Sequence, residues 1–254
     1  MRKLALALLF VLCAAPAAAA DVTVFASASL EEVIEALAES FEDSTGEEVG
    51  VTLAGRSALT RQSRRGPSTD IVITANTDWM DRMEDGKAII AETRRVIAAN
   101  RLVLGARADD ETAADTLEDA LSEGGRGMIA IGDPSHAPGG RHAREALREL
   151  GLWQALNPRT AQAGNTREVI RFVQRKMARY GIAYHTDALA YPDIREIAVF
   201  PEELHDRILY EIAITFQGQA LNRELSNRFV EHVTSEAGFA IMAAAGFVPC
   251  PDGC

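Results

Sequence analysis

Five short segments rich in serine, threonine, asparagine and glycine each lie between a predicted strand and a predicted helix. They are Ala26-Ser27-Ala28-Ser29, Gly55-Arg56-Ser57, Thr74-Ala75-Asn76, Pro138-Gly139-Gly140 and Gly164-Asn165-Thr166. Hydroxyl groups donate hydrogen bonds, and the first N–H groups of a helix have no acceptor inside it, so a helix N-terminus can bind an anion. A single turn of this kind is more often a helix cap, and Ser29 with Glu32 fits a capping box. Five such turns together favour an anion-binding site.

The strands and helices that must position these turns alternate along the chain. Short β-branched and aromatic runs predict strands, and apolar residues at helical spacing predict helices. The predicted strands are 22–26, 49–54, 71–74, 102–106, 128–131, 181–184, 197–200 and 208–216. The predicted helices are 30–43, 58–65, 77–84, 141–150 and 167–177, followed by a mostly helical tail at 220–245. This alternation implies mostly parallel sheets covered by helices, with the ligand outside the carboxyl ends of the strands.

The charge balance excludes two classes of function. The chain has 254 residues, with 26 Lys+Arg, 37 Asp+Glu and a formal net charge of −11. Such a balance argues against a general nucleic-acid binder and against a polybasic membrane-surface protein, because both depend on clustered cations. The hydrophobic fraction of 47% and charged fraction of 25% are those of a globular protein. An anionic ligand would therefore bind against the long-range field of the protein, which helix N-termini can do locally.

The N-terminus predicts export. Arg2 and Lys3 precede a short apolar run at 4–12, and three alanines stand before Asp21. This pattern is typical of a cleaved signal peptide at 1–20, and the apolar run is too short for a comfortable membrane span, although an anchoring helix is the alternative. Cleavage would remove both cations and leave 24 − 37 = −13. We therefore expect an exported mature chain that starts near Asp21.

Two cysteines stand at the other end of the chain, in Cys250-Pro251-Asp252-Gly253-Cys254. Pro-Asp-Gly is a strong turn sequence, so the two thiols can meet, and in an exported protein we expect a small local disulfide. A redox-active pair is the alternative, and metal binding by two cysteines alone is less favoured.

Residues that resemble catalytic or metal-binding groups lack the patterns that such sites need. Asp133, His136 and His142 are accompanied by no nucleophile elbow and no metal spacing, so we expect surface or capping roles for them. A ferric site of this type would require adjacent tyrosines, and the tyrosines at 180, 184 and 191 are not adjacent. Trp79 and Trp153 stand at apolar helical positions and predict core residues. The sequence therefore predicts no metal and no catalytic residues.

The ordered motifs together resemble the periplasmic molybdate-binding proteins, which are the substrate-binding components of ABC importers. The resemblance runs from about Val22 to Pro249. It rests on Val24–Leu30 (VFASASL), Ser57–Gln62 (SALTRQ), Asp70–Ala75 (DIVITA), Gly132–Gly140 (GDPSHAPGG), Asn165–Arg167 (NTR) and Gly181–Tyr184 (GIAY). It implies a two-lobed α/β protein of the type II periplasmic binding class, with a mostly parallel sheet in each lobe and two crossover strands.

The same resemblance implies the lobe boundaries, the ligand and the partners. Lobe 1 would comprise 21–102 and 208–254, and lobe 2 would comprise 103–207, with hinges near 102–106 and 208–216. A tetrahedral oxyanion, molybdate or tungstate, would bind between the lobes of a monomer and be delivered to a membrane permease, without catalysis, cofactor or nucleic acid. The implied ligand-binding residues are Ser29, Arg56 with its neighbour Ser57, Ala75, Gly139, Thr166 and Tyr184.

One position departs from the pattern of this family. Arg56 stands where the family has a serine, and a permanent guanidinium charge with a bidentate fork changes the anion that a site prefers. Asn165 and His185 near the same edge could act as acceptors for a protonated anion. The alternatives left open are a different anion (phosphate-like, phosphonate, sulfonate or carboxylate) and an Arg56 side chain that points into solvent. A secreted hydrolase or transferase is a minor alternative, for which no convincing nucleophile–base pair is evident.

Overall fold

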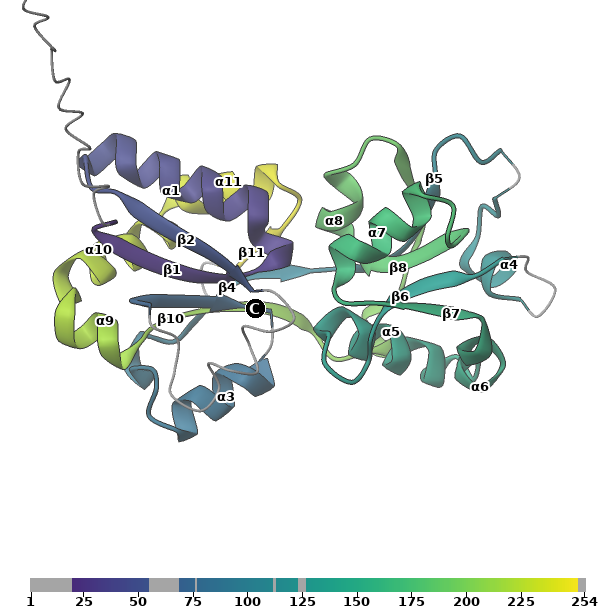
Figure 1. Cartoon of the computed structure of the whole chain (residues 1–254), viewed down its shortest axis with the longest axis horizontal. Helices are drawn as coiled ribbons and strands as arrows, with labels where there is room; N and C mark the ends of the chain where they lie inside the picture. Colours follow the sequence, from purple (N-terminus) through teal and green to yellow (C-terminus); the bar gives the residue numbers. More distant parts are fainter. Residues whose placement is uncertain (1–19, 55–68, 76, 112, 123–126, 251–254) are drawn as a thin grey trace, which may run out of the picture.

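The chain folds into two α/β units that lie side by side and are joined by two strand crossings (Figure 1). The computed structural model describes residues 20–54, 69–75, 77–111, 113–122 and 127–250. Residues 1–19 of the predicted signal peptide, the predicted helix at 58–65, and Arg56, Ser57 and Cys254 lie outside the described residues. In the described part of the chain, no helix is both long enough and apolar enough to cross a membrane.

The first unit is built on a six-stranded sheet with the order β11-β4-β10-β3-β1-β2. Its strands are β1 (Val22–Ser27), β2 (Val49–Ala54), β3 (Ile71–Thr74), β4 (Arg95–Asn100), β10 (Ile208–Ile214) and β11 (Val248–Pro249). Its helices are α1 (Glu31–Thr45), α3 (Thr77–Asp85), α9 (Phe216–Leu221), α10 (Arg223–Val233) and α11 (Glu236–Ala244), with the short 3-10 helices η1 (Ala28–Leu30) and η2 (Ala91–Thr93). Helix α1 buries Val33, Ile34, Leu37 and Phe41, at the helical spacing that the sequence predicts.

The second unit is built on a five-stranded sheet with the order β7-β6-β8-β5-β9. Its strands are β5 (Leu102–Arg107), β6 (Ile129–Gly132), β7 (Thr160–Ala163), β8 (Tyr180–Tyr184) and β9 (Ile194–Val199). Its helices are α4 (Leu117–Leu121), α5 (Pro138–Glu149), α6 (Trp153–Leu156), α7 (Thr166–Gln174) and α8 (His185–Leu189), with η3 (Asn157–Arg159). Every residue of β6 and β8 is buried.

The chain passes between the two sheets twice. It leaves the first sheet at the end of β4 and enters the second at β5, with Arg101 as the single residue between these strands. It returns from β9 to β10 through residues 200–207, which include η4 (Glu202–Leu204). Both crossings lie between the units in Figure 1. The predicted strands at 102–106 and 208–216 are therefore the strands that follow each crossing.

Both sheets are mixed: the strands of the β–α repeats pair in parallel, as predicted, and the strands that follow the crossings add antiparallel pairing. Strand β1 pairs in parallel with β2 and β3, but β10 pairs antiparallel with both β3 and β4. In the second sheet, β6 pairs in parallel with β7 and β8, whereas β5 pairs antiparallel with β8 and β9. The antiparallel ladders arise because the crossing strands enter each sheet against the direction set by its β–α repeats.

Within the described residues, the predicted elements form close to their predicted bounds. The predicted strands at 49–54 and 71–74 match β2 and β3, and the predicted helical tail divides into α9, α10 and α11. The strands β4, β7 and β11 and the short helices α4, α6 and α8 were not predicted. The edge strand β7 was not predicted because its sequence lacks the alternation of apolar and polar residues that indicates a strand. Only Ala163 in it is buried.

Candidate functional site

Three predicted ligand-binding residues of the second unit meet at one point. Gly139 lies in the first turn of α5, Thr166 is the first residue of α7, and Tyr184 is the last residue of β8. A Cβ atom placed on Gly139 would lie 2.3 Å from Thr166 Cγ2 and 3.5 Å from Tyr184 Oη. The N-terminal turns of α5 and α7 therefore meet beside the Tyr184 hydroxyl, and a side chain at position 139 would require Thr166 to shift.

The first turns of these two helices leave backbone N–H groups for a ligand. In α5, Pro138 has no N–H, and Gly140 and Arg141 both donate to the Ala137 carbonyl oxygen, so the Gly139 amide is the donor without an acceptor inside the helix. In α7, Asn165 Oδ1 accepts from the Glu168 amide at 2.9 Å and thus caps the helix. Asn165 is therefore a cap, and the amide at Thr166 is one of the first N–H groups of α7.

Ser29 lies in η1 and receives a hydrogen bond from Tyr210. The Tyr210 hydroxyl donates to Ser29 Oγ at 3.0 Å, and both residues are buried. The capping box predicted for Ser29 and Glu32 does not form, because α1 begins at Glu31 and its N-cap residue makes no side-chain cap. Ser29 is instead oriented by the β10 strand, and its own hydroxyl hydrogen is left to donate elsewhere.

Asn100 determines the direction of this chain of hydrogen bonds. Its Oδ1 accepts from the Arg101 amide at 2.9 Å, which identifies the other terminal atom as the donor Nδ2. Nδ2 donates to Thr186 Oγ1 at 2.9 Å and to the Tyr210 hydroxyl oxygen at 3.3 Å. Because Tyr210 accepts from Asn100, its single hydrogen goes to Ser29. Asn100 also links β4 of the first unit to α8 of the second, beside the first crossing.

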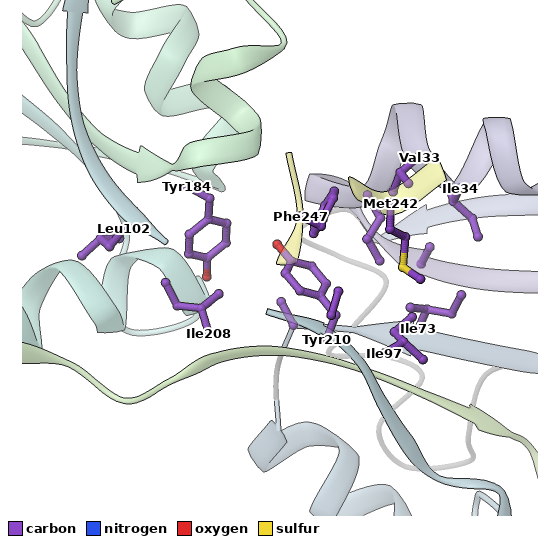
Figure 2. Close-up of a cluster of buried hydrophobic side chains, with 14 of the residues drawn as sticks. Val33, Ile34, Ile73, Ile97, Leu102, Tyr184, Ile208, Tyr210, Met242 and Phe247 are labelled. Atoms are coloured by element: carbon purple, nitrogen blue, oxygen red, sulfur yellow. The ribbon is translucent and has the colours of Figure 1, made fainter. Parts of the chain in front are cut away.

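Figure 2 shows the side chains of Tyr184 and Tyr210 on the facing sides of the two units, near Leu102 and Ile208 of the strands that follow the crossings. Burial raises the pKa of Tyr184 well above its ordinary value, and burial raises the pKa of Tyr210 in the same way. Both phenols therefore remain protonated at neutral pH and are available as hydrogen-bond donors.

A buried ion pair stands next to Thr166. Arg167 Nε lies 2.8 Å from Asp187 Oδ1, and the Asp187 carboxylate is fully buried. Burial raises the pKa of Asp187 to about 6, against the attraction of Arg167 and a hydrogen bond from Thr166, which both lower it. The other guanidinium nitrogens of Arg167 bind the carboxylate of Glu32 in α1, and this hydrogen bond lowers the Glu32 pKa. Arg167 therefore joins the second unit to the first.

A second ion pair crosses between the units on another side. Arg141, in the first turn of α5, pairs with Asp78 in the first turn of α3. In Figure 1 the helices α1 and α7 lie at the top, and α3 and α5 lie at the bottom. Helices in the upper and in the lower part of this view thus each contribute an ion pair that links the two units.

His142 contradicts its predicted surface or capping role. It is only 5% exposed, and its Nδ1 lies 3.1 Å from Tyr184 Oη. It was missed as a site neighbour because a histidine one turn into a helix carries no signal of its burial. His136 does have the predicted local role, since it lies beside Ser135 and Asp133 at the surface. His185, considered as an acceptor for a ligand, pairs with Glu196.

The remaining predicted ligand-binding residues are placed differently. Ala75 follows β3 and is buried, but its amide donates to Ser27 Oγ at 3.2 Å in this structure. Arg56 and Ser57 lie outside the described residues. A pocket of about 210 Å³ lies beside Ser29 and is lined by Glu32, Arg167 and Thr186 among others. Because Gly139, Thr166 and Tyr184 do not line that pocket, it is separate from the point where they meet.

No group of three or more metal-ligating side chains occurs in the part of the chain that the structure describes. The arrangement offers hydrogen-bond donors instead: backbone N–H groups at two helix N-termini, the Tyr184 hydroxyl and, in the first unit, the Ser29 hydroxyl. Each helix N-terminus contributes a partial positive charge of roughly +0.5. Such a set suits an anion that carries several acceptor oxygens.

Several known proteins are similar to this chain in sequence or in fold. The sequence profile of the bacterial extracellular solute-binding proteins matches residues 22–248. The molybdate-binding protein ModA of Escherichia coli is 34% identical over 231 residues, which are 89% of this chain and 88% of that protein. ModA of Haemophilus influenzae is 31% identical over 236 residues, which are 91% of each chain.

The solved structure of the periplasmic molybdate-binding protein of Azotobacter vinelandii superimposes with a TM-score of 0.78 at 21% identity, covering 89% of this chain and 98% of that one. This similarity confirms the predicted two-lobed fold of the type II periplasmic binding proteins. The relatives are solute-binding proteins, which confirms the prediction of a non-enzymatic protein. The chain belongs to the family of bacterial extracellular solute-binding proteins.

Proposed function

We propose that this protein captures a tetrahedral oxyanion, molybdate or tungstate, between its two units and delivers it to the permease of an ABC importer. The relatives named for molybdate binding support this ligand class. The observation that carries the proposal is the convergence of Gly139, Thr166 and Tyr184, because it brings two helix N-termini and a neutral hydroxyl donor to one point.

The two units act as the lobes that close on the ligand. We assign residues 21–102 and 208–254 to lobe 1 and residues 103–207 to lobe 2, since the chain changes sheets close to these boundaries, at Arg101 and at residues 200–207. Ser29 belongs to lobe 1, whereas Gly139, Thr166 and Tyr184 belong to lobe 2. The complete donor set exists only when the lobes are together, so a ligand shifts the population toward the closed form. The permease recognises that form.

A thermal-shift screen of the mature chain tests the ligand class directly. Molybdate, tungstate, sulfate, phosphate, phosphonates and small carboxylates are compared with sodium chloride at equal ionic strength. A ligand at a hundredfold excess over its Kd stabilises the folded state by about 2.7 kcal/mol. We expect molybdate and tungstate to raise Tm most. The absence of a shift with every oxyanion would contradict the binding role.

Arg56 supports a second candidate, in which the same site binds a different anion. Its guanidinium stands at the position where the resembled family has a neutral serine, beside Ser57. If Arg56 contacts the ligand, Arg56→Ser shifts preference toward molybdate and weakens phosphate-like or carboxylate ligands, because it removes a bidentate charge. Arg64→Ser, a nearby change of the same type, serves as the control. Equal anion profiles for Arg56→Ser and the parent chain would exclude the contact.

The cellular context is also a proposal. We infer a periplasmic monomer released from its signal peptide before Asp21, with a disulfide between Cys250 and Cys254. The amide of Cys250 donates to the Ile97 carbonyl at 3.0 Å, which ties the end of the chain to β4. N-terminal sequencing of the exported protein, thiol counting under denaturing conditions and light scattering test the three statements. A retained leader, two titratable thiols or a dimer mass would each refute the corresponding one.

A further inference from the structure

His142 contacts Tyr184 from inside the helix that also supplies Gly139. It lies one turn along α5, its ring centroid is 6.0 Å from that of Tyr184, and its Nδ1 is 3.1 Å from Tyr184 Oη. On its other side its ring lies 5.8 Å from that of His205, in the segment that forms the second crossing. No ligand-binding role was predicted for His142, and its position behind the Tyr184 hydroxyl is the new observation.

The hydrogen bond between these residues can run in either direction. A phenol has one hydrogen, and a neutral imidazole has one N–H and one bare nitrogen. If Tyr184 donates to Nδ1, its oxygen presents only lone pairs to the ligand, which repel an anion. If Nδ1–H donates to Tyr184 Oη, the phenol hydrogen is free to point at the ligand. The tautomer of His142 thus decides whether Tyr184 can serve an anion as a donor.

At neutral pH the His142 ring is neutral and the Tyr184 phenol is protonated, so either residue can be the donor in their hydrogen bond. Burial lowers the pKa of His142 to about 3, and the positive charge of Arg141 and the neighbouring His205 act in the same direction. The ring is therefore neutral at pH 7. Burial also raises the pKa of Tyr184, so the phenol keeps its hydrogen. A single N–H on His142 must be placed either on Nδ1 or on Nε2.

The first lobe contains the same arrangement with its direction already determined. Asn100 donates to the Tyr210 oxygen, Tyr210 donates to Ser29 Oγ, and Ser29 keeps its own hydrogen for a ligand. Each hydroxyl oxygen in that chain accepts from the interior of the lobe and donates outward. An equivalent direction in the second lobe requires His142 to be the interior donor.

We propose that His142 is a positioning residue whose Nδ1–H donates to Tyr184 Oη and thereby turns the phenol hydrogen toward the bound oxyanion. This inference rests on the proposed function, since Tyr184 must contact the ligand. His142 would then contribute to anion specificity. When Nδ1–H donates to Tyr184, the phenol donates to the ligand and favours a fully deprotonated oxyanion. When Tyr184 donates to Nδ1, the phenol oxygen can only accept and favours an anion that carries its own proton.

Calorimetric titration of variants with sodium molybdate tests the proposal. His142→Phe removes the donor to Tyr184 Oη, so the phenol hydrogen is no longer directed toward the ligand, and affinity is expected to fall about fivefold, the effect of losing one hydrogen bond between neutral groups. Asparagine places an amide N–H near the position of Nδ1, so His142→Asn is expected to recover most of this loss. In a Tyr184→Phe background, His142→Phe is expected to cause no further loss, because His142 acts only through that hydroxyl.

Three outcomes would overturn the proposal: unchanged affinity in His142→Phe, an equal loss in His142→Asn, or an additive loss in the double variant. Thermal melts show whether each variant folds. Nitrogen-15 NMR of the imidazole in the ligand-free protein gives a test that needs no variant, since it identifies which ring nitrogen carries the hydrogen. We expect Nδ1, and a proton on Nε2 alone would refute the inference. Failure of the proposed function is distinct, because the parent chain would then show no heat with molybdate.

Discussion

Arg167 at the start of α7 binds Glu32 at the start of α1, and this ion pair joins the two lobes beside Thr166 and Ser29. Arg167 also pairs with the fully buried Asp187 of its own lobe. The ion pair with Glu32 can form only when the lobes approach. If the lobes close on a ligand as proposed, this ion pair contributes to the free energy of closure.

Removing this contact should weaken ligand binding without disturbing either lobe. For Glu32→Gln we expect a Kd for the ligand that is higher by up to about fivefold, since a half-exposed ion pair contributes roughly 0.2–1 kcal/mol. The loss should appear mainly as faster release, measured by stopped-flow fluorescence, and it should shrink in high salt. Glu35→Gln, an exposed glutamate on the same helix, is the matched control. Identical release rates for the two variants would show that this ion pair does not stabilise closure.

Tyr210→Phe tests the orientation of the Ser29 hydroxyl. The substitution removes the hydrogen bond to Ser29 Oγ and leaves one Asn100 N–H without its acceptor. We expect a loss of about 1–3 kcal/mol in the free energy of unfolding, because a buried donor is left unpaired. Ligand affinity should also fall severalfold.

Tyr180→Phe provides the comparison for this change. It removes a tyrosine hydroxyl that accepts from the Ala114 amide, at the opposite end of β8 from Tyr184. It should affect stability but leave ligand affinity near that of the parent chain. An equal loss of affinity in Tyr180→Phe would mean that Tyr210 acts only on stability.

Gly139→Ala should place a methyl group between the N-terminal turns of α5 and α7. The new Cβ would lie 2.3 Å from Thr166 Cγ2, so Thr166 or the helix that carries it must shift. We expect at least a tenfold loss of affinity in calorimetric titration, since the donors at Gly139 and Thr166 would separate. Thr166→Ser lacks the methyl group that clashes, so the double variant Gly139→Ala/Thr166→Ser should regain affinity. No regain would indicate that the clash is not the cause.

His142 should make stability depend on pH in a definite direction. Its folded-state pKa is about 3, against 6.5 in an unfolded chain, so between these values the unfolded state binds the extra proton. The stability is fully present above pH 6.5 and is lost as pH falls toward 3. At pH 5 the contribution lost is about 2 kcal/mol, because 1.5 pH units below 6.5 correspond to roughly 1.36 kcal/mol each.

The comparison of variants isolates this effect from other titrating groups. The charged and titratable groups that face His142 are Arg141, Asp78, His205 and Tyr184. Asp187 changes the free energy of unfolding with pH in the opposite direction, because its pKa is raised in the folded state. His142→Asn should show a smaller fall in the free energy of unfolding from pH 7 to pH 5 than the parent chain. His136→Asn, which alters an exposed histidine, should not. Parallel pH curves for His142→Asn and the parent would refute the assignment.

Much of the architecture follows from local sequence patterns. The apolar residues of α1 at helical spacing, the buried run of β3 and the Asn165 cap before α7 depend on neighbours within a few positions. Such signals were sufficient to place the strand-to-helix turns that carry Ser29, Gly139 and Thr166. The mixed sheet direction was not accessible in this way, because strand pairing is decided by residues far apart in the chain.

The amino-acid sequence by itself determined the alternation of strands and helices and the supply of hydroxyl and N–H donors at their turns, since both depend on short-range backbone chemistry. Only the tertiary structure decided how those donors are oriented. Tyr210 is separated from Ser29 by 181 positions, and Arg167 is separated from Glu32 by 135. The burial of His142 behind Tyr184 has the same origin. A hydrogen-bond direction is determined by the partner that the fold brings near, and no local pattern specifies that partner.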